Sequence, residues 1–330
     1  MTTILNDWDK AGTLLAAASR VVILTHVSPD GDAIGSLLGL GHALLATGRQ
    51  VIMAVDEGVP PNLQFLPGSA QVLPSLAGVT TDLVIVVDCS DERRVGKVGE
   101  AARRLQTPWI NIDHHVTNVA YADANIMDPA FVSASEAVLN WLHKLNLPLS
   151  PDVAQCLLCG LVTDTLCFRI SSVTAVTFAV AQELMAAGAN LSEIVQNTIA
   201  RMPTSALLLW KQVMPSVRIE DQVTWARLTL ADKQAAAFDD KNSDGGLVSF
   251  LLQADDAYIS CIFKEKENNQ VEISLRSVPG FDVGAVAFNV GGGGHKQASG
   301  ATLDGTIDEV EAKIIPLLKA AAQAGAPLFH

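Results

Sequence analysis

Short apolar runs alternate with helical patterns through the first half of the chain. Four of these runs predict buried strands: residues 21–25 (VVILT), 51–55 (VIMAV), 83–87 (LVIVV) and the shorter 109–112 (WINI). Residues 33–47 have the spacing of an apolar helix, and Gly48 stands where that helix would end. Because strands and helices alternate, we expect an α/β domain whose mostly parallel sheet carries helices on both faces.

The second half of the chain has a different character. Further helices are expected at 133–145, 151–162 and 173–187. The pattern at 190–216 stays helical without a clear register, and we place the connection between two domains within it. Beyond it, strands are expected at 223–230, 257–264 and 271–276. These three strands favour a mixed or antiparallel sheet in the second domain.

The last hundred residues complete a second, smaller α/β domain. Asn268 and Asn269 supply turn chemistry for a hairpin between two of its strands. A glycine-rich loop is expected at 291–294 and a closing helix at 308–323. The predicted organisation is therefore an α/β domain at 1–190, a helical linker at 191–215 and a smaller α/β domain with a mixed sheet at 216–330.

Length and charge narrow the classes of function. The 330 residues suit two domains, since a domain has about 150 residues on average. Lys and Arg number 22 and Asp and Glu 35, so the formal net charge is −13. Affinity for a long phosphate backbone comes mostly from Lys and Arg, which argues against a protein that coats nucleic acid. Small anionic substrates are still permitted if metal ions or a cationic pocket offset the overall field.

We expect a cytoplasmic protein without a membrane partner. No apolar run reaches the roughly 18 residues of a membrane span, and the polar first residues do not resemble a secretion signal. Cys156 and Cys159 form a C-x2-C pair, but they lie in the apolar run VAQCLLCGLV without a second pair. We interpret them as buried small hydrophobic residues rather than zinc ligands.

Imidazoles and carboxylates gather where the predicted strands end, which is where ligands bind in open α/β sheets. A single aspartate at such a turn is commonly a helix N-cap or part of a tight turn. Here three strand ends and one helix end contribute at once. The residues are His26, Asp30, Asp32, Asp88, Asp113, His114, His115 and Asp164.

This many carboxylates cannot all stay ionised close together without a cation. Two divalent metal ions, held about 3.5–4 Å apart by a bridging carboxylate, account for the whole set. The donors are carboxylate and imidazole, without thiolate. This donor set suits Mn²⁺, and less strongly Mg²⁺ or Fe²⁺, better than a closed structural zinc site.

The polar clusters resemble the motifs of a known superfamily. HVSPDGDAIGS, VVDCSDERRVG, IDHHVTN and GLVTDTLCFR, in this order and spacing, resemble the four motifs of the DHH phosphoesterases. SLRS followed by GGGGHKQASGAT resembles the DHH-associated C-terminal domain of one branch. The resemblance covers nearly the whole chain.

The resemblance implies a role for each metal-binding residue. The ligands of one ion would be His26 and Asp30, those of the other Asp32, His114 and Asp164, and Asp88 would bridge the two.

Around the metals, the resemblance implies three supporting residues in the first domain. Asp113 would orient a histidine. His115 would hold the scissile phosphate or protonate the leaving oxygen. Arg94 is either a ligand of a phosphate oxygen or an ordinary solvated arginine.

In the second domain, the resemblance implies a group that binds the nucleotide. Arg276 would be a planar partner for phosphate, and glycines let backbone N–H groups approach a phosphate or base closely. The members of this group are Arg276, Gly292, Gly293, Gly294 and His295.

Two positions need separate comment. Relatives commonly carry a small residue where this chain has Leu166 and Cys167, a difference that would narrow the pocket beside Asp164. Cys89 follows Asp88 directly. Strand alternation points its side chain away from that of Asp88, so we interpret Cys89 as a packing residue.

The length and two-domain layout most resemble members of the nano-RNase type. These are bifunctional oligoribonucleases that also hydrolyse 3′-phosphoadenosine 5′-phosphate (pAp). The expected reactions are removal of mononucleotides from the 5′ end of short RNA, and conversion of pAp to AMP and phosphate. The expected partners are short RNA oligonucleotides, pAp or pApA, and a second copy of the chain in a homodimer, but not long duplexes.

Four alternatives stay open at this point. A phosphodiesterase for cyclic di-AMP or pApA would use the same motifs. A 5′ exonuclease for long strands would share the metal centre, but the net charge of −13 argues against it. An inorganic pyrophosphatase lacks the glycine-rich second domain. A non-catalytic nucleotide-binding regulator would have lost metal ligands, and this chain has the full set.

Overall fold

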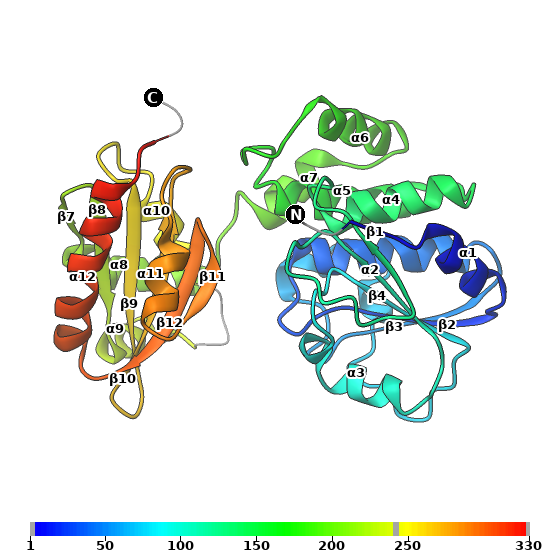
Figure 1. Ribbon diagram of the computed structural model, residues 1–330, viewed down its shortest axis with the longest axis horizontal. Coiled ribbons are helices and arrows are strands. Elements are labelled where there is room, and N and C mark those ends of the chain that lie inside the picture. Colours follow the sequence, from blue (N-terminus) through cyan, green and yellow to red (C-terminus); the bar gives the residue numbers. More distant parts are fainter. Residues whose placement is uncertain (1–3, 240–243, 328–330) are drawn as a thin grey trace. The chain divides into compact units, whose positions relative to one another are not determined.

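The N-terminal part of the chain is built on a six-stranded sheet with the order β1-β6-β5-β4-β2-β3 (Figure 1). The computed structural model describes residues 4–239 and 244–327, except for the side chain of His295. β2 to β6 run parallel, and the short β1 pairs antiparallel with β6 at one edge. The strands are β1 (Leu5–Asn6), β2 (Arg20–Leu24), β3 (Gln50–Ala54), β4 (Leu83–Val87), β5 (Trp109–Asp113) and β6 (Ala124–Met127).

Strand alternation divides the apolar side chains between two faces of this sheet. Val21 and Ile23 of β2 belong to a large core under helices α2, α4 and α5, whereas Val22 and Leu24 belong to a smaller core under α3. α3 accordingly lies on the opposite side of the sheet from α2 and α4 (Figure 1). The helices are α1 (Trp8–Ala16), α2 (Gly31–Leu45), α3 (Gly96–Arg103), α4 (Ala134–Lys144), α5 (Pro151–Asp164), α6 (Ala175–Ala186) and α7 (Leu191–Thr198). The expected parallel sheet with helices on both faces is confirmed.

The strand order determines where this unit can bind a ligand. From β2 the chain moves outward to β3, then returns to the other side of β2 to form β4, β5 and β6. The connections after β2 and β4 therefore leave in opposite directions, and open α/β sheets bind ligands at the carboxyl ends of two such neighbouring strands. The polar clusters of the sequence follow these strands and β5.

A second sheet, with the order β11-β12-β10-β9-β8-β7, organises the C-terminal unit. Among the described strands of this second sheet, β8 and β9 pair in parallel and the other neighbours pair antiparallel. The sheet is therefore mixed, as expected. The strands are β7 (Arg218–Glu220), β8 (Val223–Leu228), β9 (Ile259–Lys266), β10 (Gln270–Ser277), β11 (Gly293–His295) and β12 (Ala298–Asp304).

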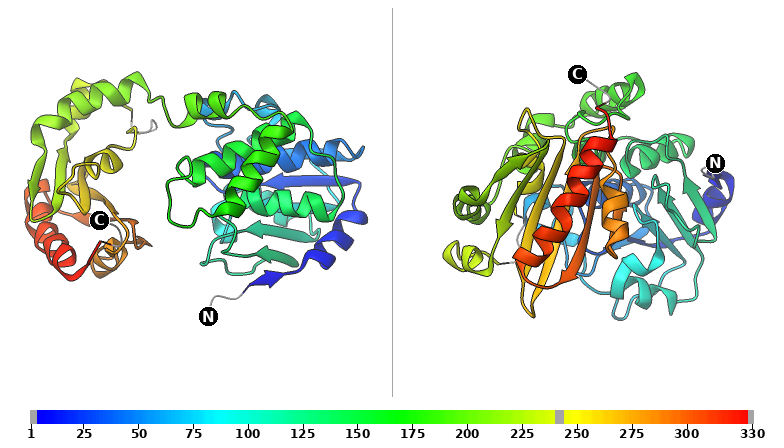
Figure 2. Two further views of the ribbon diagram at one scale, coloured as in Figure 1. Left: turned by 90° about the horizontal axis from the view of Figure 1, so that it is seen from above. Right: turned by 60° about the vertical axis from the view of Figure 1, so that its left-hand side comes forward.

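Helices cover both faces of this second sheet. α11 and α12 lie side by side over one face, and Ile273 and Leu275 of β10 belong to the core beneath them (Figure 2). α8 and α10 pack on the other face against Ala226 and Ile262. The helices are α8 (Thr204–Val213), α9 (Leu230–Ala235), α10 (Leu247–Leu251), α11 (Val283–Asn289) and α12 (Ile307–Ala324). None of the helices in the described ranges is long and apolar enough to cross a membrane.

The chain divides into compact units at Arg201 and Met202, inside the segment 191–215. That segment contains the end of one unit, α7, and the start of the other, α8, rather than one continuous helical linker. Contrary to the prediction of a loop at 291–294, Gly293 and Gly294 begin the edge strand β11, which pairs with β12 across the two-residue turn 296–297. Glycine lowers strand propensity, and here the ladder to β12 overrides that preference.

Candidate metal centre

The loop after β2 brings two donor residues, His26 and Asp30, to the carboxyl end of the sheet. His26 is buried, and its Nδ1 lies 2.8 Å from the backbone oxygen of Val27, so this nitrogen carries the proton and Nε2 faces the site as a free lone pair. Asp30 caps helix α2: its Oδ1 accepts hydrogen bonds from the backbone N–H groups of Asp32 and Ala33. The cap uses one oxygen of Asp30. We predicted the helix to begin near Ala33, but the cap starts it at Gly31.

Asp88 lies at the centre of the cluster, directly after β4. Its backbone has φ +53°, in the left-handed region that aspartate tolerates better than most residues. One carboxylate oxygen, Oδ2, lies 3.5 Å from Nε2 of His26. The other, Oδ1, lies 3.7 Å from Nε2 of His114 and 3.6 Å from Nδ1 of His115. The two oxygens of Asp88 therefore face different groups of donors.

A third set of donors comes from two helices and the end of β5. Helix α5 continues to Asp164, two residues beyond the predicted end, and places this carboxylate 3.5 Å from Nε2 of His114. The same nitrogen lies 3.9 Å from Oδ2 of Asp32 on α2. Asp32, His114 and Asp164 thus approach one point from three different elements.

Donor atoms converge in three groups, and within each group they lie within 4.8 Å of one another. The groups are His26 with Asp30 and Asp88, Asp32 with His114 and Asp164, and Asp88 with His114 and His115. Asp88 occurs in two groups, which is the arrangement that a bridging carboxylate requires. The six residues that the sequence predicts as metal ligands are therefore brought together.

The electrostatics of the cluster call for a cation. Burial, together with the charges of Asp32 and Asp30, raises the pKa of Asp88 well above its ordinary value. Burial and the charges of Asp32 and Asp88 raise the pKa of Asp164 to about 9. Burial also lowers the pKa of both His26 and His114, which keeps these imidazoles neutral and able to coordinate.

Two buried atoms support the same conclusion. Among the described residues, Asp88 Oδ1 and His114 Nε2 have no hydrogen-bond partner, although both are shielded from solvent. A buried polar atom without a partner costs about 1–3 kcal/mol, and more when it is charged. A divalent cation would satisfy both atoms, so the residues present fit a metal centre of oxygen and imidazole ligands.

Beside the donors, Asp113 and His115 form a tight pair. Nδ1 of His115 lies 2.7 Å from Oδ1 of Asp113, which is fully buried. Burial alone would lower the pKa of His115, but the hydrogen bond and the charge of Asp113 raise it to about 9. His115 is therefore held in one orientation and protonated near neutral pH, as a group that binds phosphate or gives a proton to a leaving oxygen needs to be.

A buried amide network supports this pair, and the sequence analysis did not identify it. The side-chain nitrogen of Asn118 donates to Oδ2 of Asp113 at 2.6 Å and to Oδ1 of Asn111 at 2.7 Å. Asn111 in turn donates to the hydroxyl of Tyr121. The sequence offered one indication of this network, the Asn at the end of the IDHHVTN motif. A polar side chain so near a buried Asp–His pair is a candidate hydrogen-bond partner for that pair.

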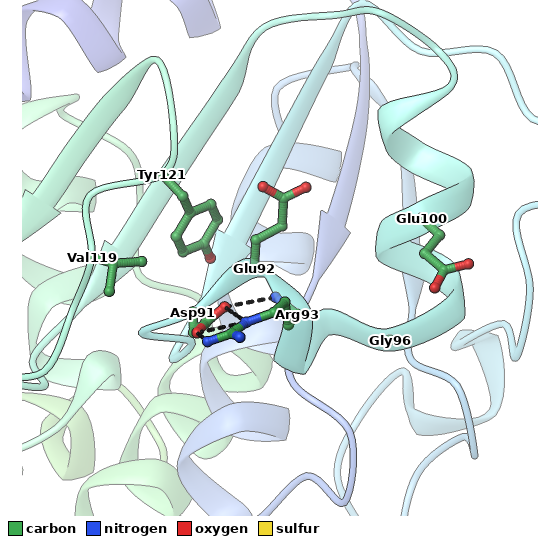
Figure 3. Close-up of a pocket in the computed structure, with 7 residues that line it drawn as sticks. All are labelled: Asp91, Glu92, Arg93, Gly96, Glu100, Val119 and Tyr121. Atoms are coloured by element: carbon green, nitrogen blue, oxygen red, sulfur yellow. Dashed lines mark hydrogen bonds and ion pairs between the residues drawn. The ribbon is translucent and has the colours of Figure 1, made fainter.

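A cavity of about 390 Å³ lies beside this network but contains none of the predicted metal ligands (Figure 3). The residues that line it are Asp91, Glu92, Arg93, Gly96, Glu100, Val119 and Tyr121. Its carboxylates are largely engaged, since Asp91 binds Arg93 and Glu92 binds Arg103. The donor cluster, rather than this cavity, is therefore the candidate site.

Arg94 lies in the short 3-10 helix η3 (Glu92–Val95) in the connection after Asp88, and its side chain is exposed. Its backbone oxygen accepts a hydrogen bond from Val27, which ties this loop to the one after β2. The charge of Arg94 contributes to lowering the pKa of His26. A position near the cluster is consistent with the predicted contact to phosphate.

The C-terminal unit holds its predicted residues on neighbouring strands. Arg276 lies on β10, partly buried, and Ala298 is its partner across the ladder on β12. Gly293 and Gly294 pair with Gly300 and Ser299, so the glycine motif forms the edge of the sheet next to β12. His295 belongs to β11 by its backbone, whereas its side chain lies outside what the structure describes.

The remaining predicted positions pack in the N-terminal unit. Cys89 is fully buried in the core under α3, and burial raises the pKa of its thiol to about 11, as a packing residue requires. Cys156 and Cys159 lie in the core between the sheet and its helices. Leu166 and Cys167 both have left-handed backbones in the turn that follows Asp164 and Thr165, and Leu166 is about half exposed.

A parallel sheet with these donors at its switch point, followed by a mixed-sheet unit with a glycine-rich edge, defines a two-domain phosphoesterase that depends on metal ions. The chain belongs to the DHH family: residues 20–161 match the DHH family, N-terminal domain, and residues 235–324 match the DHHA1 domain. The predicted family resemblance is confirmed, and with it the prediction of a hydrolase acting on phosphoester bonds.

Two curated relatives and one solved structure are similar to this chain over most of its length. The bifunctional oligoribonuclease and PAP phosphatase NrnA of Thermus thermophilus is 31% identical over 94% of this chain and 94% of its own. A probable enzyme of the same name from Streptococcus mutans is 29% identical over 88% of this chain and 92% of its own. The crystal structure of an exopolyphosphatase-related protein from Bacteroides fragilis is 26% identical and has a TM-score of 0.88, covering 98% of this chain and 100% of that protein.

Proposed function

We propose that this protein is a Mn²⁺-dependent phosphoesterase with two substrates. It removes mononucleotides from the 5′ end of short oligoribonucleotides and converts pAp to AMP and phosphate. The observation that carries the proposal is the convergence of three donor groups, two of which contain Asp88. Similarity to NrnA over 94% of both chains supports the choice of substrates.

Six residues would hold two metal ions. His26 and Asp30 would bind one ion, Asp32, His114 and Asp164 the other, and Asp88 would bridge them. When bound, the ions supply Lewis acidity and a hydroxide nucleophile at neutral pH. Mn²⁺ is the proposed metal because it accepts a mixed set of carboxylate and imidazole ligands.

The remaining residues of the N-terminal unit act on the substrate directly. His115, held by Asp113, would donate the proton that the leaving oxygen needs. Its raised pKa keeps that proton available near neutral pH. Arg94 would offset charge on a phosphate oxygen, since its guanidinium is exposed and near His26.

In the C-terminal unit, Arg276 and the glycine-rich edge would bind the nucleotide away from the scissile bond. Burial lowers the pKa of Arg276, but a guanidinium stays charged in proteins, so it presents a partly desolvated cation. Gly292 precedes the edge strand β11, and Gly293 and Gly294 belong to it, so no side chain at these three positions would stand between the backbone and a phosphate or base. The His295 imidazole belongs to the same proposal.

The decisive experiment is a panel of substrates incubated with the Mn²⁺-loaded protein. It compares pAp, di- to pentaribonucleotides, pApA and cyclic di-AMP. Phosphate release from pAp together with mononucleotides from short RNA is the expected result. Activity confined to cyclic di-AMP or pApA would replace the proposal by its alternative. Binding of nucleotides without hydrolysis of any of them would indicate a regulator.

Asp88→Asn tests the metal centre itself. The amide cannot bridge two cations as a carboxylate does, so we expect hydrolysis to fall by at least about 1,000-fold, on the order of a lost metal-based stabilisation of several kcal/mol. Asp152→Asn, in the first turn of α5 and outside the site, is the matched control. Hydrolysis by Asp88→Asn at the rate of the control would contradict the assignment.

A homodimer and a cytoplasmic location complete the proposal. Both follow from the similarity to enzymes of the NrnA type. Sedimentation equilibrium of the full chain, with and without Mn²⁺, measures whether the protein is a homodimer. A single monomeric species at micromolar concentration would remove the dimer from the proposal.

A further inference from the structure

Asp32 is the most tightly held carboxylate of the metal centre. Its side chain lies at the first turn of α4, where the backbone N–H of Ala134 donates to Oδ2 at 2.6 Å and that of Ser135 donates to Oδ1 at 2.9 Å. Only 1% of Asp32 is exposed. The first turn of a helix has unpaired N–H donors and a positive dipole, so it both orients and stabilises an anion.

Two hydroxyl groups extend this arrangement. Ser36, one turn after Asp32 on α2, directs its hydroxyl toward Oδ1 of Asp32 at 3.4 Å. The hydroxyl groups of Ser36 and Ser135 lie 2.9 Å apart and are both buried. The Ser135 hydroxyl therefore reaches Asp32 through the hydroxyl of Ser36. Ser135 thus holds Asp32 directly through its backbone N–H and indirectly through its hydroxyl.

A glycine on α5 leaves the room that this contact needs. A Cβ on Gly160 would lie 2.6 Å from Oδ1 of Asp32 and would collide with the hydroxyl of Ser135. Three helices therefore meet at one carboxylate: α2 carries it, α4 binds it and α5 makes space for it. Asp30 contrasts with this arrangement, because it is exposed and its bonded oxygen is held by its own helix.

We propose that Ser135 is a positioning residue, which fixes the Asp32 carboxylate for the ion bound by Asp32, His114 and Asp164. The inference rests on the proposed metal centre. Because Asp32 is fixed by a neighbouring helix and Asp30 is not, the two ions differ in how far their ligands are organised before binding. Loss of the Ser135 hydroxyl therefore affects one of the two ions, rather than both.

The test is calorimetric titration of Mn²⁺ into the chelator-treated full-length protein, with wild type and Ser135→Ala compared. Wild type is expected to bind two ions. In Ser135→Ala the affinity for one ion falls by about tenfold, the usual effect of removing a residue that orients a metal ligand, and the other affinity is unchanged. At saturating Mn²⁺, the KM for pAp is expected to stay within about twofold, since only 1% of Ser135 is exposed.

Ser133→Ala is the matched control on the same turn of α4. Ser133 is buried and caps the helix by accepting a hydrogen bond from the N–H of Glu136, and no contact between it and Asp32 is recorded within the described residues. This variant is expected to lower the unfolding temperature without changing either Mn²⁺ affinity. Equal weakening of binding in Ser133→Ala and Ser135→Ala would overturn the proposal, because general loosening of α4 would then explain both.

Ser36→Ala keeps the test decisive if Ser135→Ala does not fold. It removes the hydroxyl that links the Ser135 hydroxyl to Asp32, so a comparable loss at the same ion is expected. Unchanged affinity in either folded variant overturns the positioning role. A wild-type protein that binds no Mn²⁺ would instead refute the proposed metal centre, so the two failures are distinguishable.

Discussion

At the scale of single residues, the carboxylates of the metal centre make the metal-free protein sensitive to pH. Burial and neighbouring carboxylates raise the pKa of Asp164 to about 9, far above the 3.8 of an exposed aspartate. A group whose pKa is raised by folding contributes stability that is fully present below its unfolded pKa. That stability is lost as the pH rises through the folded value. The affected window therefore runs from about pH 4 to about pH 9.

We expect the free energy of unfolding in chelator to fall as the pH rises from 5 to 9. One such group contributes a slope of at most about 1.4 kcal/mol per pH unit. Asp164→Asn removes the group and flattens the slope, whereas Asp152→Asn, outside the cluster, leaves it unchanged. Urea unfolding at each pH, for the three proteins, measures the slopes. Parallel curves for all three proteins would show that Asp164 is not the source of the pH dependence of stability.

Asn118 is the second residue whose role can be isolated. It donates to Asp113, which holds His115, but the contacts recorded for its side chain include none of the six predicted metal ligands. Asn118→Ala is expected to lower kcat for pAp by about tenfold while leaving the affinity for Mn²⁺ unchanged. It also leaves a carboxylate oxygen of Asp113 without this donor, at a cost of about 1–3 kcal/mol in stability.

Asn125→Ala provides the comparison for that variant. Asn125 is buried on β6 and its side chain holds the backbone of Ala122, so its loss affects stability in a similar way. No change in kcat is expected, since Asn125 is not part of the network below His115. Steady-state kinetics and calorimetry on both variants separate the two effects. A similar fall in kcat for both would mean that stability, not the Asp113–His115 pair, limits the rate.

At the scale of elements, the turn after α5 contains three consecutive residues with left-handed backbones. Leu166, Cys167 and Phe168 have φ values of +49°, +60° and +63°. For residues with a Cβ this conformation costs about 1–2 kcal/mol each, and it is usually confined to single residues. The turn directly follows Asp164, so the strain lies next to a predicted metal ligand.

Leu166→Gly is expected to stabilise the protein by about 1 kcal/mol, because glycine adopts this conformation without the steric cost. Leu166 is half exposed, so little apolar burial is lost. Leu207→Gly, at a similarly exposed position in the right-handed helix α8, is expected to destabilise by about 1 kcal/mol. Urea midpoints give both values. A loss of stability in both variants would show that Leu166 contributes contacts that outweigh its strain.

The sequence was sufficient to predict several buried strands and helices and the donor residues that converge at their ends, for a shared reason. β2 and β4 are buried on both sides and therefore read as unbroken apolar runs, and the donors follow directly at their ends. The antiparallel β1 has two residues and β6 has four, too few for a periodic signal, and both were missed. Short elements of this kind are fixed by tertiary pairing rather than by local preference.

The supporting contacts could not be predicted, because they join distant parts of the chain. Asp32 and Ser135 are 103 positions apart, and nothing local to Ser135 marks it as a partner of a metal ligand. The position of Asp164 as the last residue of α5 shows the same limit, since it depends on how far the helix continues. The role of Asn118 was easier to predict from the sequence, because this residue lies only five positions from its partner Asp113.

At the scale of the whole molecule, the metal centre changes how the net charge is understood. The chain carries a formal charge of −13, and four of its acids lie in the proposed metal centre. Two divalent cations would offset those four charges, so the loaded site is far less negative than the chain as a whole. The remaining acidic residues leave the rest of the chain with a net negative charge, which repels a long polyanion.

Substrate length should therefore matter little beyond the first few nucleotides. Binding that relies on many phosphate contacts strengthens with strand length and weakens steeply with salt, by nearly one power of the salt concentration per phosphate contacted. For this protein we expect the kcat/KM for a single-stranded 30-mer to be no higher than that for a trimer. We also expect the salt dependence for the trimer to correspond to about two phosphate contacts. Initial rates at 50 and 200 mM salt, for both strands in saturating Mn²⁺, measure each quantity. Faster hydrolysis of the 30-mer with a steep loss at high salt would reveal an extended binding track and favour an exonuclease for long strands.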